Sequence, residues 1–218
     1  MMTTKTSTVP RVPCNTRYCG VVMGASAGGR EALAEILSRL PEDYALPILI
    51  VQHLHPGDDG AFAQHLTQAG RRVVVVPCDK EEIEPGRVYV APANYHMLVE
   101  RNGTIALSVD ERVNWSRPSI DVLFDSAAHV WGERLIAAIL SGASSDGAQG
   151  IHTVKALGGL CIAQDPRTAE HPVMPQAAID AGAVDRVMTL EEMAQLLVEV
   201  ERLSNAECGT RNEEYERR

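Results

Sequence analysis

The chain has 218 residues, a formal net charge of −9 and only 4% aromatic residues. This length fits one domain or two small ones, and it is enough to bury a real core. The acidic balance argues against nucleic-acid binding by bulk electrostatics, and the few aromatics predict a core of Val, Ile, Leu and Ala, as in a parallel sheet buried on both faces.

The predicted elements follow a Thr- and Pro-containing stretch, residues 1–18, that we expect to be a disordered leader. After it, short apolar runs alternate with segments of helical spacing. We predict strands at 19–25, 46–52, 72–77, 87–92, 134–142, 159–165 and 185–189. We predict helices at 29–40, 60–70, 119–131, 147–157, 175–181 and from Leu190 onward.

Two further strands, 96–100 and 104–109, are predicted to form a hairpin, because Asn102-Gly103 between them supplies positive φ at low cost. The alternation of the other strands with helices indicates an α/β fold. We therefore expect a doubly wound, mainly parallel sheet flanked by helices, with one antiparallel hairpin.

The end of the chain carries a predicted capping box, Thr189 with Glu192, at the start of the last helix. The folded domain should span residues 19–203, and a polar tail should follow at 204–218. The five cysteines are odd in number and match no zinc or redox spacing, so we expect reduced thiols. No signal peptide or membrane span is predicted, and this favours a cytoplasmic protein without membrane insertion.

The turn GASAGG, residues 24–29, joins a predicted strand to a predicted helix. Its glycines allow a tight turn, and the helix behind it offers unpaired N–H groups. Such a turn binds phosphate, presents Ser26 as a nucleophile beside oxyanion-binding amides, or uses Ser26 only as a helix cap. The spacing matches neither GxGxxG nor a P-loop, because position 26 is Ser and the turn contains no Lys.

The second predicted strand ends in VQHLHP, which places His53 at the carboxyl edge where open α/β sheets bind their ligands. His53 could be a packing residue, a general base or, with His55, Asp58 and Asp59, part of a metal site. No further nitrogen or sulfur ligand stands at a convincing spacing, so we expect no metal.

Asp146 lies in SGASSDGAQG, a second Gly-rich turn between a strand and a helix. It could cap that helix, or it could accept an imidazole N–H and fix the tautomer of a histidine. Ser26, His53 and Asp146 would then meet at three strand ends as a triad. Substitution of any of the three should lower kcat sharply and leave the fold intact.

Seven segments of the sequence, in this order, resemble the catalytic domain of CheB, the chemotaxis protein-glutamate methylesterase. One such segment would be weak evidence, but the ordered set is highly specific and covers roughly residues 20–190. The segments are GASAGG, VQHLHP, APANYHM, RPSIDVLF, SGASSDGAQG, AQDPRTAEHPVMPQAAI and AVDRVMTL.

The resemblance implies a cytoplasmic serine hydrolase without a cofactor that removes methyl esters from glutamate side chains of methyl-accepting chemotaxis receptors. It also implies deamidation of certain receptor glutamines. It assigns the nucleophile to Ser26, the general base to His53 and the orienting acid to Asp146. The partners would be the methylated cytoplasmic helices of chemoreceptors and, in addition, a separate regulator, because we expect no receiver domain in the short stretch 1–18.

Four more residues are candidates for the substrate pocket or the oxyanion site. Ala27 follows the nucleophile, and Ala143 lies in the turn before Asp146. His96 and Met174 lie in matched segments, and a purely structural role is the alternative for each.

The aspartate turn departs from the family's usual pattern, TGMGxDGAxG. Ser141 stands in place of Thr, and Ala143-Ser144 stands in place of Met-Gly, which puts the local oxyanion geometry or the substrate fit in question. Two other functions fit the same residues: a non-catalytic anion-binding module in which Ser26 is only a cap, and an esterase of the same fold in a related signalling pathway.

Overall fold

A seven-stranded parallel sheet forms the centre of the fold, with the strand order β3-β4-β2-β1-β7-β8-β9. The structure, a computed structural model, describes residues 17–70 and 72–215, and side chains as far as residue 202. The strands are β1 (Gly20–Ala25), β2 (Ile48–Gln52), β3 (Val74–Val75), β4 (Val88–Val90), β7 (Leu135–Ile139), β8 (Leu160–Gln164) and β9 (Arg186–Met188).

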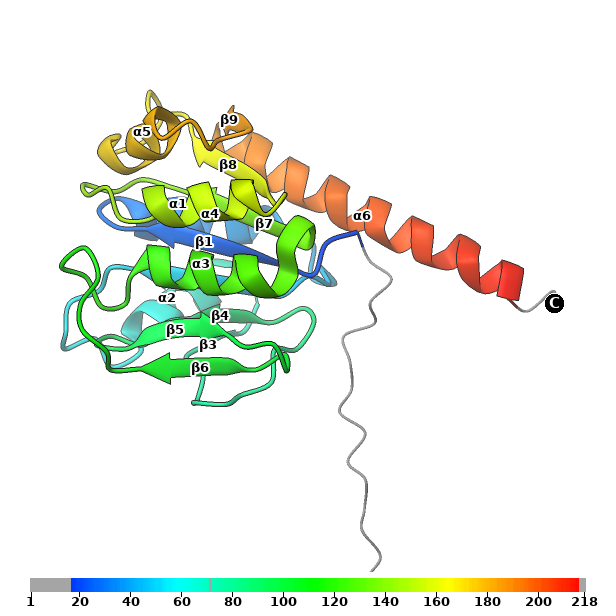
Figure 1. The fold of residues 1–218 in the computed structure, drawn as a ribbon, viewed down its shortest axis with the longest axis horizontal. Helices are drawn as coiled ribbons and strands as arrows, with labels where there is room; N and C mark the ends of the chain where they lie inside the picture. The colour runs from blue at the N-terminus through cyan, green and yellow to red at the C-terminus, as the bar shows by residue number, and fades with distance from the viewer. Residues whose placement is uncertain (1–16, 71, 216–218) are drawn as a thin grey trace, which may run out of the picture.

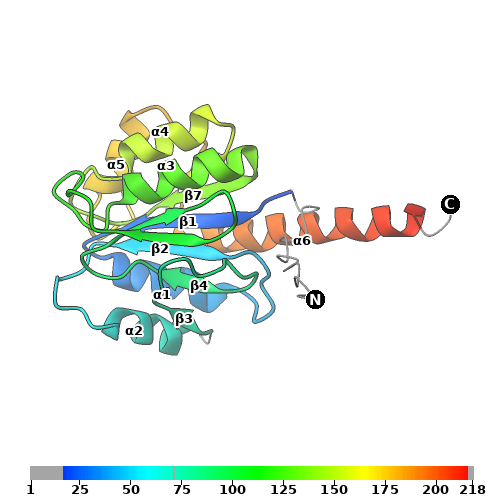
Figure 2. The ribbon, with the colours of Figure 1, turned by 60° about the horizontal axis from the view of Figure 1, so that its bottom comes forward.

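Helices cover both faces of the sheet, which confirms the predicted doubly wound α/β architecture (Figures 1 and 2). One face carries α1, α2 and α6, and the other carries α3, α4 and α5. The helices are α1 (Gly29–Arg39), α2 (Ala61–Gly70), α3 (Ile120–Trp131), α4 (Ala148–Ala156), α5 (Val173–Asp180) and α6 (Leu190–Tyr215), with a short 3-10 turn at Gly132–Arg134.

The central strand β1 shows why the strands are apolar along their whole length. Its side chains alternate between two cores: Val21 and Met23 pack on the side of α1, and Val22 packs on the side of α3. All three are fully buried. Because both faces of the sheet are covered, its strands appear in the sequence as continuous apolar runs rather than as an alternating pattern.

The hairpin of β5 (His96–Val99) and β6 (Ile105–Ser108) is antiparallel, as predicted, and the structure shows that it forms a sheet of its own. The turn differs in one detail, because Gly103 (φ 86°) and not Asn102 has the positive φ. The Gly103 N–H donates to the Glu100 carbonyl oxygen at 3.0 Å. The hairpin packs against α3 and enlarges the core on that side of the sheet.

The observed elements differ most from the predicted ones at α6 and β3. Helix α6 continues to Tyr215, so most of the predicted polar tail is helical, and Figure 1 shows it extending beyond the rest of the fold. Strand β3 covers two residues of the predicted run 72–77 and pairs only with β4 at the edge of the sheet. The predicted leader, 1–18, lies outside the described residues except for its last two positions.

The predicted capping box at the start of α6 is confirmed. The Thr189 N–H donates to Glu192 Oε2 at 2.8 Å, and the Glu192 N–H donates to Thr189 Oγ1 at 3.3 Å. These bonds fix the direction in which α6 leaves β9. Within the described part of the chain, no helix combines the length and the apolar character that a membrane crossing requires.

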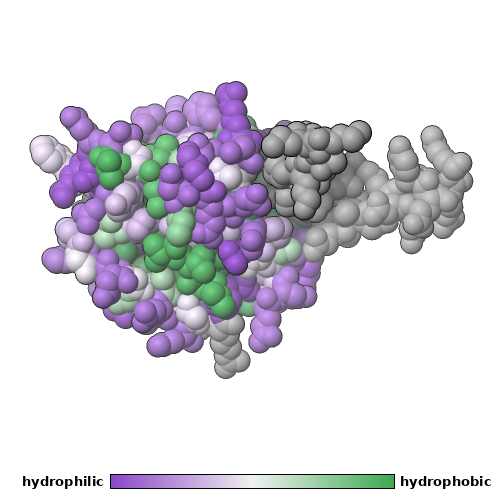
Figure 3. Space-filling model, turned by 90° about the horizontal axis from the view of Figure 1, so that it is seen from below, coloured by the Kyte–Doolittle hydropathy of each residue, from purple (hydrophilic) through white to green (hydrophobic). Residues whose placement is uncertain are grey.

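The described surface is mainly hydrophilic, with a local cluster of hydrophobic residues on the face shown in Figure 3. Single exposed apolar side chains are ordinary on protein surfaces, so only an unusually large exposed fraction sets one of them apart from the rest. The large apolar side chains that are exposed are those of Val73, Val76, Tyr95, Val109, Val113, Trp115, Leu157, Val173 and Val187.

The strand order brings the three predicted triad residues to one edge of the sheet. Ser26 follows β1, His53 follows β2 and Asp146 lies in the turn after β7, and β1 pairs with both β2 and β7. After β1 the chain moves toward β4 on one side and then returns to β7 on the other, so this edge is a topological switch point. Open α/β sheets bind ligands at such points.

Candidate active site

The turn after β1 holds Ser26 by its main chain. The Ser26 N–H donates to the Ser141 carbonyl oxygen at 2.9 Å, and the Ser26 carbonyl oxygen accepts hydrogen bonds from Gln52 Nε2 at 2.7 Å and from the Gly29 N–H at 2.9 Å. Among the described residues, no hydrogen bond involves the Ser26 hydroxyl. The backbone is therefore fixed while the hydroxyl is free to react.

Ser26 does not cap α1, so that interpretation is wrong. The residue at the cap is Gly28, with φ 73°, and no side chain bonds to the first turn. A Cβ atom at Gly28 would lie 2.6 Å from Ser141 Oγ and 2.8 Å from Glu170 Cβ. Only glycine fits this crowded, left-handed position, and this is why the turn can bring Ser26 so close to the β7 loop.

His53 leaves β2 beside this turn. Its N–H donates to the Ala25 carbonyl oxygen at 3.1 Å, and its imidazole Nε2 lies 2.8 Å from Asp146 Oδ2. The imidazole is 16% exposed, so one edge of the ring remains open to a substrate. The buried Gln52 side chain bonds to the carbonyl oxygens of both Ser26 and His53, which ties the two segments together.

Five donors surround the fully buried carboxylate of Asp146. Two of them are the first N–H groups of α3, so Asp146 caps α3 and not α4, whose cap is Gly147. The prediction that Asp146 caps the helix that follows it is therefore wrong. The donors are His53 Nε2 (2.8 Å), Asn114 Nδ2 (3.0 Å), Ser119 Oγ (2.8 Å), Ile120 N–H (2.7 Å) and Asp121 N–H (3.3 Å).

These donors keep Asp146 ionised. Burial by itself raises the pKa of the carboxyl group, but the hydrogen bonds, that from His53 above all, outweigh burial and hold the pKa below its ordinary value. A carboxylate can only accept hydrogen bonds, so His53 Nε2 carries a proton. In the neutral ring, Nδ1 is then the basic nitrogen.

A second carboxylate lies next to the first. Asn114 Nδ2 donates to Asp121 Oδ2 at 2.6 Å as well as to Asp146. Burial raises the pKa of Asp121, and the charge of Asp146 adds to this, although the Gly150 N–H donates to it at 2.6 Å. Asn114 thus bridges two acidic groups whose charges would otherwise repel each other.

Sequence reasoning missed three polar residues that position the site, namely Gln52, Asn114 and Ser119. Gln52 lies in VQHLHP and Ser119 lies in RPSIDVLF. The signal for Gln52 was a polar side chain at the end of a buried strand, and the signal for Ser119 was a polar side chain just before a helix. Asn114 lies outside these segments, in a loop without periodicity, so the sequence offers no comparable signal.

Two of the candidate residues present unpaired backbone donors at the turns. The N–H groups of Ala27 and Ala143 make no hydrogen bond within the described structure, and the same holds for Gly28. The side chain of Ala143 is exposed, and the Ala27 carbonyl oxygen accepts a bond from Ser141 Oγ at 2.8 Å. These amides are available to an oxyanion beside Ser26.

His96 and Met174 are buried, with exposed fractions of 2% and 1%. His96 Nδ1 accepts the Ser119 N–H at 3.2 Å, and its Nε2 lies 3.0 Å from the Glu111 carbonyl oxygen. Met174 packs against Gly142, where a Cβ atom would lie 2.6 Å from its Sδ. Both side chains make contacts within the fold, and a part in substrate contact stays a prediction for each.

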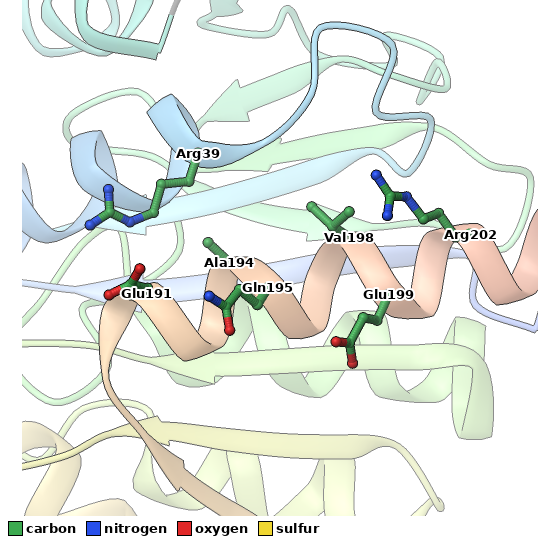
Figure 4. A pocket seen from close by; sticks show the side chains of 7 residues that line it. All are labelled: Arg39, Glu191, Ala194, Gln195, Val198, Glu199 and Arg202. Atoms are coloured by element: carbon green, nitrogen blue, oxygen red, sulfur yellow. The ribbon is translucent and has the colours of Figure 1, made fainter.

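A metal site near His53 and a pocket between α1 and α6 are the other two candidate sites. Within the part of the chain that the structure describes, no three His, Cys, Asp or Glu side chains gather as metal ligands would, and His55 Nδ1 accepts the Gly57 N–H at 3.1 Å. A pocket of about 390 Å³ between α1 and α6 contains none of the three triad residues (Figure 4). It is lined by Arg39, Glu191, Ala194, Gln195, Val198, Glu199 and Arg202.

Comparison with known sequences gives a consistent result. The family model described as CheB methylesterase matches residues 21–197. A Leptospira interrogans protein assigned to protein-glutamate methylesterase/protein-glutamine glutaminase is 47% identical over 184 residues, which are 84% of this chain and 95% of that protein. Protein-glutamate methylesterase/protein-glutamine glutaminase 2 of Pseudomonas aeruginosa is 38% identical over 82% of this chain, which spans only 52% of that relative.

Comparison with solved structures agrees. The crystal structure of the Thermotoga maritima CheB methylesterase catalytic domain superposes with a TM-score of 0.80 at 34% identity, and the match covers 84% of this chain and 98% of that domain. The expected resemblance in sequence is thus matched by the same arrangement of strands and helices. The chain belongs to the CheB methylesterase family.

Proposed function

We propose that the chain is a protein-glutamate methylesterase in which Ser26 is the nucleophile, His53 the general base and Asp146 the orienting acid. The observation that carries the proposal is the 2.8 Å bond between His53 Nε2 and the buried Asp146 carboxylate, on strands that flank the one bearing Ser26. The names of the curated relatives support the same activity.

The reaction needs only groups that this site contains. His53 Nδ1 takes the proton of the Ser26 hydroxyl while Oγ bonds to the ester carbonyl carbon, and Asp146 stabilises the imidazolium. The unpaired amides of Ala27 and Ala143 are the candidates to receive the oxyanion, and one such donor contributes roughly 10²–10³-fold to rate. The C–O bond then breaks, His53 gives its proton to the leaving methanol, and a water molecule clears the acyl-enzyme by the same steps.

A hydrogen bond between the Ser26 hydroxyl and His53 is absent from the described interactions. In the absence of substrate such bonds are commonly long, and they tighten when the reacting group is bound. Ring orientation is the part that must exist beforehand, and Asp146 supplies it through Nε2.

The same acyl-enzyme forms when the substrate is a glutamine side chain, with ammonia in place of methanol as the leaving group. The names of the relatives include protein-glutamine glutaminase. Deamidation is therefore a second activity of the proposed site, and its natural substrates are the cytoplasmic helices of chemoreceptors. This places the enzyme in the cytoplasm.

An anion-binding role for the serine turn is the less favoured function. Phosphate would have to bind near the ionised Asp146 and the neighbouring Asp121, which repel a negative group. A neutral methyl ester meets no such repulsion. Hydrolysis of a small activated ester by the purified chain separates the two functions, because a binding module would show none.

The direct test is release of methanol from receptor membranes that carry methyl-esterified glutamates. The purified chain should release methanol in proportion to enzyme and time, and mass spectrometry of the receptor should show loss of methyl groups at glutamate. Activity on small esters without any release from receptors would assign the fold to an esterase of another signalling pathway.

Ala143→Met is expected to raise kcat/KM for receptor methyl esters about two- to tenfold. Ala143 is exposed in the turn between β7 and α4, so a larger apolar side chain fits there and adds a wall to the substrate site. Each methylene group buried against the substrate contributes about 0.8 kcal/mol. Steady-state kinetics measure this, and unchanged or lower kcat/KM would show that this pocket is built without a wall at position 143.

A further inference from the structure

Trp115 is the most exposed large apolar side chain that the structure describes. Its exposed fraction is 93%, against 69% for the next, Val73. Tryptophan has the largest apolar surface of the common side chains, and it is concentrated in the energetically dominant parts of protein interfaces. Nothing in the described fold covers this residue.

The backbone at Trp115 is unfavourable as well. Val113 and Ser116 close a two-residue turn with N–H···O bonds of 2.9 and 3.2 Å, and its central residues have φ of 50° (Asn114) and 64° (Trp115). A left-handed backbone is tolerated by Asn but is a genuine outlier for a bulky residue. The fold holds this backbone in place but leaves the Trp115 side chain uncovered, and such strain combined with exposure indicates a function outside the fold.

This turn is attached directly to the proposed triad. Asn114 donates to the Asp146 carboxylate at 3.0 Å and to Asp121 at 2.6 Å. The length of one Asn side chain and one peptide unit places the Trp115 Cα atom within roughly 11 Å of Asp146 Oδ1. An α-helix with its side chains is about 10–12 Å across. A helix that binds over the proposed triad is therefore wide enough to span the distance from Asp146 to Trp115.

The loop that carries Trp115 is held at both ends. Arg117 Nη1 donates to the carbonyl oxygens of Val109 (2.7 Å) and Asp110 (2.8 Å), so Arg117 braces the loop. His96 Nε2 lies 3.0 Å from the Glu111 carbonyl oxygen. A rigid support lowers the entropy cost of binding, since the ring is already presented before the substrate arrives.

We infer that Trp115 is a docking residue that contacts the methyl-esterified protein substrate beside the scissile ester. This rests on the proposed function, and it names the feature that distinguishes a protein-borne ester from a small one. The partner is the helical segment of the substrate that flanks the modified glutamate. A small ester reaches Ser26 without touching Trp115.

Trp115→Ala is therefore expected to raise KM for methylated receptor about tenfold or more, as truncation of a central aromatic anchor does. The kcat value for receptor, and kcat/KM for a small activated ester, should change less than twofold. Trp115→Phe keeps an apolar ring and should recover most of the lost KM. Leu157→Ala, which truncates another exposed side chain at the C-terminal end of α4, is the matched control. It should leave KM and kcat unchanged for both substrates.

Equal loss on receptor and small ester would overturn the inference, because it would show that Trp115 only supports Asn114 and Asp146. An unchanged KM for receptor would also overturn it. So would a wild-type dimer, seen by analytical ultracentrifugation, that dissociates on Trp115→Ala, because the occupant would then be a second copy of the chain.

A binding measurement separates this inference from the proposed function. The chain has two tryptophans, so Trp131→Phe leaves Trp115 as the sole reporter. Combined with Ser26→Ala to prevent turnover, this variant should show a blue shift and reduced acrylamide quenching on addition of a methyl-esterified receptor helical fragment. A shift without methanol release by the wild type would support docking and refute the methylesterase; the absence of both would refute each.

Discussion

Ser26→Ala is expected to lower kcat for methyl-ester hydrolysis by about 10³- to 10⁶-fold, the range that loss of a triad nucleophile causes. The free energy of unfolding should change by less than about 0.5 kcal/mol. The reason is that the hydrogen bonds between Ser26 and its partners Ser141, Gln52 and Gly29 all use main-chain atoms of Ser26, which alanine retains. Methanol release at saturating receptor and urea unfolding measure the two quantities.

The control for this variant is Ser38→Ala, which removes a serine hydroxyl near the C-terminal end of α1, the helix that follows the Ser26 turn. The Ser38 hydroxyl donates only to the Glu35 carbonyl oxygen at 2.8 Å. Its activity should match that of the wild type. Adding His53→Ala to Ser26→Ala should lower kcat little further, because the residues act as one unit. Turnover near the wild-type value by folded Ser26→Ala would refute the assignment of the nucleophile.

Asp146→Asn is expected to damage both activity and stability. The activity should fall about 10²- to 10⁴-fold, since an amide cannot fix the tautomer of His53 as a carboxylate does. The free energy of unfolding at pH 7 should fall by about 2–4 kcal/mol, because an amide NH₂ must face at least one of the five buried donors. Urea unfolding and methanol release test this.

The stability difference should depend on pH. The pKa of Asp146 is lowered in the folded protein, so its stabilising contribution is complete above the unfolded carboxyl pKa of about 4 and is lost as the pH falls through the lower folded value. The gap between wild type and Asp146→Asn should therefore narrow below about pH 4. The exposed Asp125→Asn is the control and should show no gap. Equal unfolding free energies at pH 7 would contradict this account of Asp146.

This expectation departs from what the sequence alone predicts. There, Asp146 either caps its own helix or orients a histidine, and its substitution leaves the fold intact. The structure favours a loss of stability instead, because four of the five donors to Asp146 come from residues 114–121, about 30 positions earlier in the chain. Contacts of this kind leave no periodic signal, because they depend on how α3 and the β7 loop pack in three dimensions.

The secondary structure could be predicted from the sequence more fully than the site, because its signals are local. Strands such as β1 and β7 are buried on both faces, so each appears as an unbroken apolar run between glycine-rich turns. The capping box at Thr189 could also be predicted, because it depends only on residues three positions apart in the sequence. The edge strand β3 is short because only β4 pairs with it, and its neighbours cannot be inferred from its own residues.

On the proposed triad, the hydrogen bonds of Asp146 also set the earliest point in synthesis at which the site can be complete. A nascent chain that ends after α3 already contains Ser26 and His53, yet the imidazole lacks its acceptor and the first amides of α3 lack their cap. Both gaps are filled at once when residue 146 arrives with the β7 loop. One side chain thus joins the β7 loop to the start of α3 and to the imidazole, so on the proposed triad a chain that ends before residue 146 lacks a complete site.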